Sequence, residues 1–93
     1  MLNKEEAEKI VKRFSPTTKL TITKRPGREG IYMGKTNEII ITHDWNVAGL
    51  LHEITHARLY LDGRDYRHSV DFAHEFTKIV GEYLEDKVDV AED

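Results

Sequence analysis

A histidine, a glutamate and a second histidine lie within five residues near the middle of the chain. They are His52, Glu53 and His56 in the segment HEITH. On an α-helix, residues four apart lie about 40° apart around the axis and about 6 Å apart along it, so both imidazoles project from one face. Two imidazoles at that spacing can bind one metal ion, and the glutamate beside them can reach a water molecule held there. The spacing therefore predicts a hydrolytic metal site, with His52 and His56 as ligands and Glu53 as general base. The alternative interpretation is a solvated helix face without a metal.

A catalytic zinc ion usually has three protein ligands and one open position, so a third ligand is required. The chain has no cysteine, which restricts the ligands to His, Asp and Glu. A second helix, expected over residues 68–84, should form a hairpin with the HEITH helix, and this register places His68 opposite the site. We predict His68 as the third ligand. Glu75 and His74 remain alternatives, although His74 should face solvent, and Asp71 or Glu75 could instead accept hydrogen bonds from ligand imidazoles.

The helices that must hold these residues have recognisable starts. Asn3, with a glutamate three positions later, predicts the start of an N-terminal helix that Pro16 ends. Asp44 or Asn46 can cap the helix that carries HEITH, which we expect over residues 47–61. Its apolar residues fall on one stripe, and the two histidines lie nearly opposite that stripe. They should therefore face solvent or form one wall of a cleft.

Three short segments between the first two helices are separated by turn residues, and the first of them alternates between apolar and polar residues, which is typical of strands. They cover residues 19–25, 31–34 and 38–43. The order of elements predicts an α+β fold with a small, mainly antiparallel three-stranded sheet packed on helices. With 93 residues, the chain should form a single domain over residues 1–93.

Composition restricts the partners. The net charge of −3 argues against nucleic acid as the main partner, although Lys24, Arg25 and Arg28 could form a local basic patch. Charged residues of both signs make up 33% of the chain, a composition found in thermophile proteins. The charged N-terminus is not typical of a signal peptide, and no apolar run reaches the roughly 20 residues that a membrane span needs. We therefore expect a cytoplasmic protein with no membrane partner.

HEITH followed by a downstream histidine resembles the zinc-dependent metallopeptidases of the zincin type. The segment that follows it resembles the SprT-like proteases, in which a third ligand lies in an H-G-x-x-(Phe/Trp) motif. Here that motif reads His68-Ser69-Val70-Asp71-Phe72, with Ser69 in place of the glycine. The small size and mixed charge resemble the minigluzincins, which are minimal metallopeptidases with histidine as third ligand. SprT-like enzymes usually carry DNA-binding extensions that this chain lacks, so we favour the minigluzincin-like interpretation.

The resemblance implies a zincin-like domain that binds one zinc ion and hydrolyses peptide bonds in peptides or unfolded proteins. The metal would activate a water molecule, and Glu53 would move its proton to the leaving amine. The strands 31–34 or 38–43 should form the upper rim of the cleft. Three side chains are candidates to stabilise the oxyanion: Tyr60, Tyr66 and His74. The alternative function is a zinc-binding interaction domain without hydrolytic activity.

Residues 85–93 carry five acidic side chains against one basic residue, Lys87. The simplest interpretation is a solvated end. Val88 and Val90 alternate with acidic residues, however, so this segment could lie along the sheet edge and place a carboxylate at the open metal position. The minigluzincin resemblance likewise implies latency through the C-terminal segment.

Overall fold

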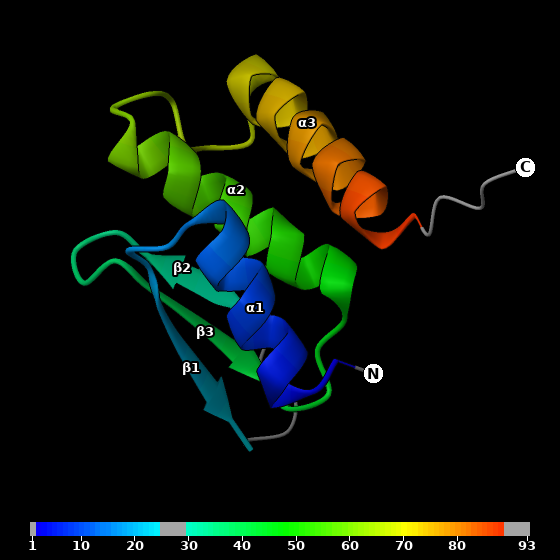
Figure 1. Ribbon diagram of the computed structural model, residues 1–93. Coiled ribbons are helices and arrows are strands. Elements are labelled where there is room, and N and C mark those ends of the chain that lie inside the picture. Colours follow the sequence, from blue (N-terminus) through cyan, green and yellow to red (C-terminus); the bar gives the residue numbers. More distant parts are fainter. Residues whose placement is uncertain (1, 25–29, 89–93) are drawn as a thin grey trace, which may run out of the picture.

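The computed structural model describes residues 2–24 and 30–88 (Figure 1). Helices α1 and α2 lie against the sheet, and α3 packs on α2 on the side away from the sheet. This arrangement confirms the α+β expectation. The elements are, in order, α1 (Lys4–Phe14), β1 (Lys19–Thr23), β2 (Ile31–Met33), β3 (Glu38–Thr42), α2 (Val47–Leu61) and α3 (Val70–Lys87).

The sheet is mixed, with the strand order β1-β3-β2, so the expectation of a mainly antiparallel sheet is wrong. The central strand β3 pairs parallel with β1 over five residues and antiparallel with β2 over three. The cause is the apolar character of β3, whose Ile39 and Ile41 are buried. A central position buries more of a strand than an edge position does, so β3 inserts between the two strands that precede it. This order leaves β2 at one edge of the sheet, beside α2.

Side-chain caps set the starts of the helices. Asn3 accepts a hydrogen bond from the backbone N–H of Glu6 at 2.8 Å, which confirms the start of α1, and Asn46 accepts one from Gly49 at 2.7 Å. The cap of α2 is therefore Asn46 and not Asp44. Ser69 caps α3 in the same way, so that helix begins at Val70 and not at residue 68. His68 consequently lies in the loop between α2 and α3.

Helix α2 is buried around most of its circumference, because it lies between the sheet and α1 on one side and α3 on the other (Figure 1). The expectation of one apolar stripe was therefore too simple. Glu53 and Thr55 are buried along with the aliphatic residues, whereas Leu61 at the end of the helix is 49% exposed. His52 and His56 are half-buried and face the start of α3. They form the wall of a cleft, which was one of the two expected outcomes.

The start of the acidic segment belongs to α3, which continues to Lys87. Asp86 pairs with Arg13 of α1 at 3.2 Å, so this end of α3 is attached to α1. Residues 89–93 lie outside the described residues, as do two members of the expected basic patch, Arg25 and Arg28. None of the helices among the described residues combines the length and apolar character of a membrane span.

Candidate metal centre

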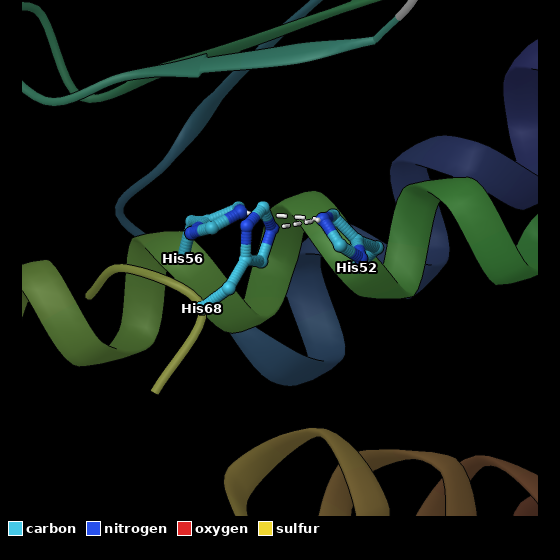
Figure 2. A group of neighbouring side chains, drawn as sticks. All are labelled: His52, His56 and His68. Carbon is cyan, nitrogen blue, oxygen red and sulfur yellow. Dashed lines mark hydrogen bonds between the residues drawn. The ribbon is translucent and has the colours of Figure 1, made fainter. Parts of the chain in front are cut away.

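Three imidazoles converge at one point between α2 and the loop that precedes α3 (Figure 2). Nε2 of His52 lies 3.0 Å from Nε2 of His68 and 3.3 Å from Nε2 of His56. The three residues each offer a ring nitrogen, and these nitrogens lie within 4.8 Å of one another. Two nitrogens that each lie about 2.0–2.1 Å from a tetrahedral zinc ion are about 3.3–3.4 Å apart. The two distances from His52 are close to this value, and the three rings together form a group that could hold one ion.

The proton on His56 has a defined position. Nδ1 of this ring donates a hydrogen bond to the backbone carbonyl of Tyr66. In the neutral ring, Nε2 is then unprotonated, and its lone pair is free to bind a metal ion. The carbonyl thus does what an outer-shell acceptor does for a metal-bound histidine. The expectation that Asp71 or Glu75 would do this is wrong, because both carboxylates pair with arginines instead.

The environment of the histidines favours their neutral form. Burial lowers the pKa of His52, and the charges of His56 and His68 lower it further. Burial also lowers the pKa of His56, and although the hydrogen bond to Tyr66 opposes this, the shift remains downward. Metal binding requires unprotonated imidazoles. At neutral pH, protons therefore compete little with a metal ion for the ring nitrogens of His52 and His56.

Phe72 contacts all three imidazoles from the first turn of α3. Its ring centroid lies 4.8 Å from that of His52, 4.7 Å from His56 and 5.1 Å from His68. Phe76 stacks on Phe72 one turn later, with a centroid distance of 5.8 Å. Phe72 is 8% exposed and forms an apolar support for the cluster. Sequence analysis named Phe72 only as the last residue of the motif that begins at His68 and missed this role, although its position four residues after His68 was the available signal.

The alternative ligands lie elsewhere. Both carboxylate oxygens of Glu75 are paired, with Arg58 at 3.0 Å and with Arg64 at 3.3 Å. His74 is exposed on α3 and does not belong to the histidine group. The structure thus brings His68 to the two histidines of α2, whereas Glu75 pairs with arginines and His74 stays outside the group.

Glu53 lies where two cavities meet. One, of about 510 Å³, is lined by Glu53, His56 and His68, by Tyr60 and Tyr66, and by residues of β2 and its turn. The other, of about 390 Å³, is lined by Glu53 and His52 with an apolar group comprising Gly30, Trp45, Ala48, Gly49 and Phe76. Glu53 is 8% exposed and borders both. The carboxylate expected to act as base therefore lies inside a cleft and not on an open surface.

Edge strand β2 forms one wall of the larger cavity, as expected for one of the two candidate strands. Tyr60 of α2 packs between Tyr32 of β2 and Tyr66 of the loop, with ring centroids 5.9 Å and 5.3 Å away. A Cβ atom at Gly34 would lie 2.6 Å from the Tyr60 ring, so only glycine permits this approach. The three tyrosines therefore give the larger cavity an aromatic wall.

Comparison of the chain with protein-family models, curated proteins and solved structures found no match. The identity of the metal must therefore be inferred from the chemistry of the three ligands. Imidazole nitrogens suit zinc, copper, iron and nickel, and three of them with an open fourth position form a common catalytic zinc site. The residues present fit a zinc ion.

Proposed function

We propose that the protein is a zinc-dependent metallopeptidase that hydrolyses peptide bonds in peptides or unfolded proteins. The observation that carries this proposal is the convergence of His52, His56 and His68 beside Glu53, which borders both cavities. When bound by the three histidines, zinc would supply Lewis-acid chemistry to a water molecule and to a substrate carbonyl. The remaining chemistry depends on the residues of the chain.

Glu53 would act as general base and then as general acid. It occupies the same helix as two of the histidines, so its backbone position relative to them is fixed by α2. A carboxylate held between the two cavities can accept a proton from the attacking water on one side. It can then pass that proton to the amine that leaves as the peptide bond breaks. The two products would then lie in the two cavities, one on each side of Glu53.

The edge strand β2 supports an extended substrate. Within the described residues, β2 pairs only with β3, which leaves its other edge available to a further strand. A peptide that adds to this edge gains backbone hydrogen bonds without regard to its sequence, provided that it is extended. Unfolded proteins and flexible peptides meet that condition, whereas folded domains do not.

Two tyrosines are candidates to stabilise the oxyanion. Tyr60 and Tyr66 line the larger cavity together with Glu53. A phenolic O–H can donate a hydrogen bond to an oxygen that becomes negatively charged in the transition state. His74, which sequence reasoning also offered for this role, is exposed on α3 and lines neither cavity.

The decisive experiment compares the unaltered protein with Glu53→Gln. The unaltered protein, purified without chelator, should contain about one zinc ion per chain. It should cleave an unfolded protein such as casein, lose this activity with a chelator and regain it with added zinc. Glu53→Gln should keep the zinc and lower kcat/KM by about 10²–10⁴-fold, the usual contribution of a general base. A protein that binds zinc but shows no cleavage dependent on Glu53 would instead be a zinc-binding interaction domain.

A further inference from the structure

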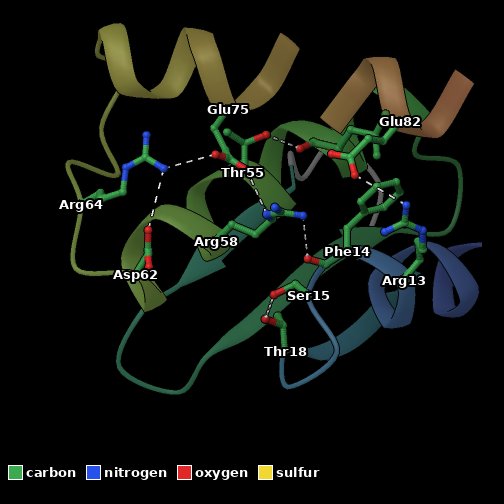
Figure 3. Close-up of polar contacts among 11 residues, drawn as sticks. Arg13, Phe14, Ser15, Thr18, Thr55, Arg58, Asp62, Arg64, Glu75 and Glu82 are labelled. Atoms are coloured by element: carbon green, nitrogen blue, oxygen red, sulfur yellow. Dashed lines mark hydrogen bonds and ion pairs between the residues drawn. The ribbon is translucent and has the colours of Figure 1, made fainter. Parts of the chain in front are cut away.

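An ion-pair cluster around one buried carboxylate connects α3 to the loop that carries the third histidine (Figure 3). At its centre is Glu75, whose residue is 7% exposed. One carboxylate oxygen pairs with Nε of Arg58 on α2 at 3.0 Å, and the other accepts a hydrogen bond from Arg64 of the loop at 3.3 Å. Arg64 also approaches Asp62 and Asp71, each at 3.8 Å. Glu75 therefore has two arginine partners, one on a helix and one on the loop.

The loop over residues 62–69 contributes two atoms to the metal centre. One is the carbonyl oxygen of Tyr66, which accepts from His56, and the other is the ring nitrogen of His68. Neither residue belongs to a helix or strand, and both are exposed. Their positions therefore depend on the contacts that hold the loop. The Arg64 side chain supplies such a contact two residues before Tyr66 and four before His68.

The backbone at the start of the loop directs Arg64 toward α3. Gly63 adopts a φ of 69°, and its N–H donates to the carbonyl of Tyr60 at 3.1 Å. The N–H of Arg64 donates to the carbonyl of Leu59 at 2.9 Å. These bonds end α2 and turn the chain. The guanidinium of Arg64 then reaches Glu75, so the loop is attached to α2 by its backbone and to α3 by this side chain.

We propose that Glu75 is a positioning residue of the metal centre and that it acts through Arg64. This inference rests on the proposed metal site but does not depend on hydrolysis. By binding Arg64, the buried carboxylate holds the loop so that the Tyr66 carbonyl and the His68 ring keep their places. Arg58 shares the same carboxylate but links it to α2, and through the carbonyl of Phe14 to α1. The ion pair and the hydrogen bond of the Arg58 side chain thus join helices, and neither involves the loop.

Loss of the contact between Arg64 and Glu75 should lower the affinity for the metal ion. A buried carboxylate requires charged partners, and the loss of one partner is costly. Metal binding in turn requires ligand distances within about 0.2 Å of their ideal values. A loop released from α3 would hold His68 over a wider range of positions than the metal accepts. The cost would therefore appear as lower metal affinity.

The test uses the two arginines as a matched pair. Arg64→Met and Arg58→Met each remove one partner of Glu75 while retaining much of the aliphatic side chain. Zinc affinity is measured on the metal-free proteins by competition with a chromophoric chelator, after circular dichroism shows that each is folded. We expect Arg64→Met and Glu75→Gln to lower zinc affinity about 10- to 100-fold, the usual effect of losing an outer-shell contact. Arg58→Met should lower the melting temperature and leave zinc affinity close to that of the unaltered protein.

The sign of the Arg64 effect separates positioning from electrostatics. Removal of a positive charge should strengthen the binding of a cation if charge alone mattered. Positioning through the loop requires weaker binding instead. Arg64→Met should also add little to Glu75→Gln, because both changes break the same contact. If Glu75→Gln fails to fold, Arg64→Met carries the test, since Arg64 is partly exposed and its loss leaves Glu75 paired with Arg58.

Several results would overturn the inference. Zinc affinity that is unchanged or higher in Arg64→Met would do so, as would an equal loss in Arg58→Met. An unaltered protein that binds no zinc would overturn both this inference and the metal site. A protein that binds zinc, shows the expected pattern in the arginine variants and cleaves nothing would support the inference and overturn only the peptidase proposal.

Discussion

The ring of His56 donates its Nδ1 proton to the backbone carbonyl of Tyr66, ten residues further along the chain. This bond leaves Nε2 unprotonated, 3.3 Å from Nε2 of His52. Because the acceptor is a backbone atom, the side chain at position 66 should not matter for it. Tyr66→Phe is therefore expected to bind zinc as tightly as the unaltered protein, and the competition assay measures this directly. A marked loss of affinity would show that the hydroxyl itself supports the site.

Removal of any ligand should abolish zinc binding. His52→Ala, His56→Ala and His68→Ala each leave two nitrogens where zinc needs three. His74→Ala should keep full zinc content, because that residue is exposed and lies outside the group. Zinc content by atomic emission after gel filtration distinguishes them. Stoichiometric tight zinc in His68→Ala would mean that the third ligand has been misassigned.

Phe72 should affect both stability and metal affinity, since it is buried against the three imidazoles. Phe72→Ala is expected to lower the free energy of unfolding of the metal-free protein by about 3–5 kcal/mol. Phe72→Leu keeps most of the volume and should lose less stability. Chemical denaturation measures the free energy of unfolding, and the chelator competition measures metal affinity.

If Phe72 acts only through the core, Phe72→Leu will bind zinc as tightly as the unaltered protein. If it also supports the imidazoles, Phe72→Leu will bind more weakly although it is folded. A matched control is Ile79→Val, a buried substitution further along α3. It should cost about 0.5–1.5 kcal/mol of stability and leave zinc affinity unchanged.

The metal-free protein should lose stability as the pH falls below about 6.5, the usual pKa of histidine. The pKa values of His52 and His56 are lowered in the folded state, mainly by burial. Above the usual value both states are neutral, and these groups contribute nothing to the pH dependence. As the pH falls, the unfolded chain binds protons that the folded chain does not, so unfolding becomes more favourable until the folded-state pKa values are passed.

Thermal melts of the metal-free protein between pH 7.5 and 5 would measure this slope. His52→Asn removes one of the two groups and should make the slope shallower. Zinc binding should weaken in the same range, because protons compete for the same nitrogens. A melting temperature that does not change over this interval would contradict the assignment of half-buried, neutral imidazoles.

The features that could be predicted from the sequence are local ones. The spacing of His52 and His56 specifies their relative direction on any helix, and Asn3 and Asn46 are caps whose effect reaches only three residues. The start of α3 was misplaced because Ser69, whose hydroxyl accepts from the N–H of Phe72, was not considered as its cap. His68 was nevertheless placed at the site, since the hairpin register depends on chain distance from the turn.

The features that could not be predicted depend on distant contacts. The parallel pairing of β1 with β3 arises from competition among strands for the central position, and no single segment carries that information. The residue type at position 66 does not indicate that its carbonyl accepts from His56, because every residue has a backbone carbonyl. The role of Glu75 was hidden for a similar reason. Its arginine partners lie 17 and 11 residues away in sequence, and a carboxylate near a metal site resembles a ligand until those partners are known.

The acidic segment permits a test of latency. Arg13 pairs with Glu82 at 3.6 Å and with Asp86 at 3.2 Å, so the last turns of α3 contribute to the fold. A truncation should therefore follow Val88, which caps the helix, and not residue 85. Val88 lies about 24 Å of helix beyond Phe72, whereas five extended residues span at most about 18 Å, so the segment reaches the metal centre only if the last turn of α3 opens. Its effective concentration there is then low, and we expect removal of residues 89–93 to raise peptidase activity by about twofold or less.

The reason for the expected gain is that a carboxylate of this segment would compete for the open metal position in the full-length chain. A full-length variant with Asp89, Glu92 and Asp93 changed to the corresponding amides separates that mechanism from simple steric cover. If the carboxylates block the site, this variant and the truncation should gain activity equally on casein at matched zinc content. If the segment only covers the cleft, the truncation alone should gain. Equal activity in the unaltered protein, the truncation and the amide variant would contradict the latency hypothesis and favour the interpretation of residues 89–93 as a solvated end.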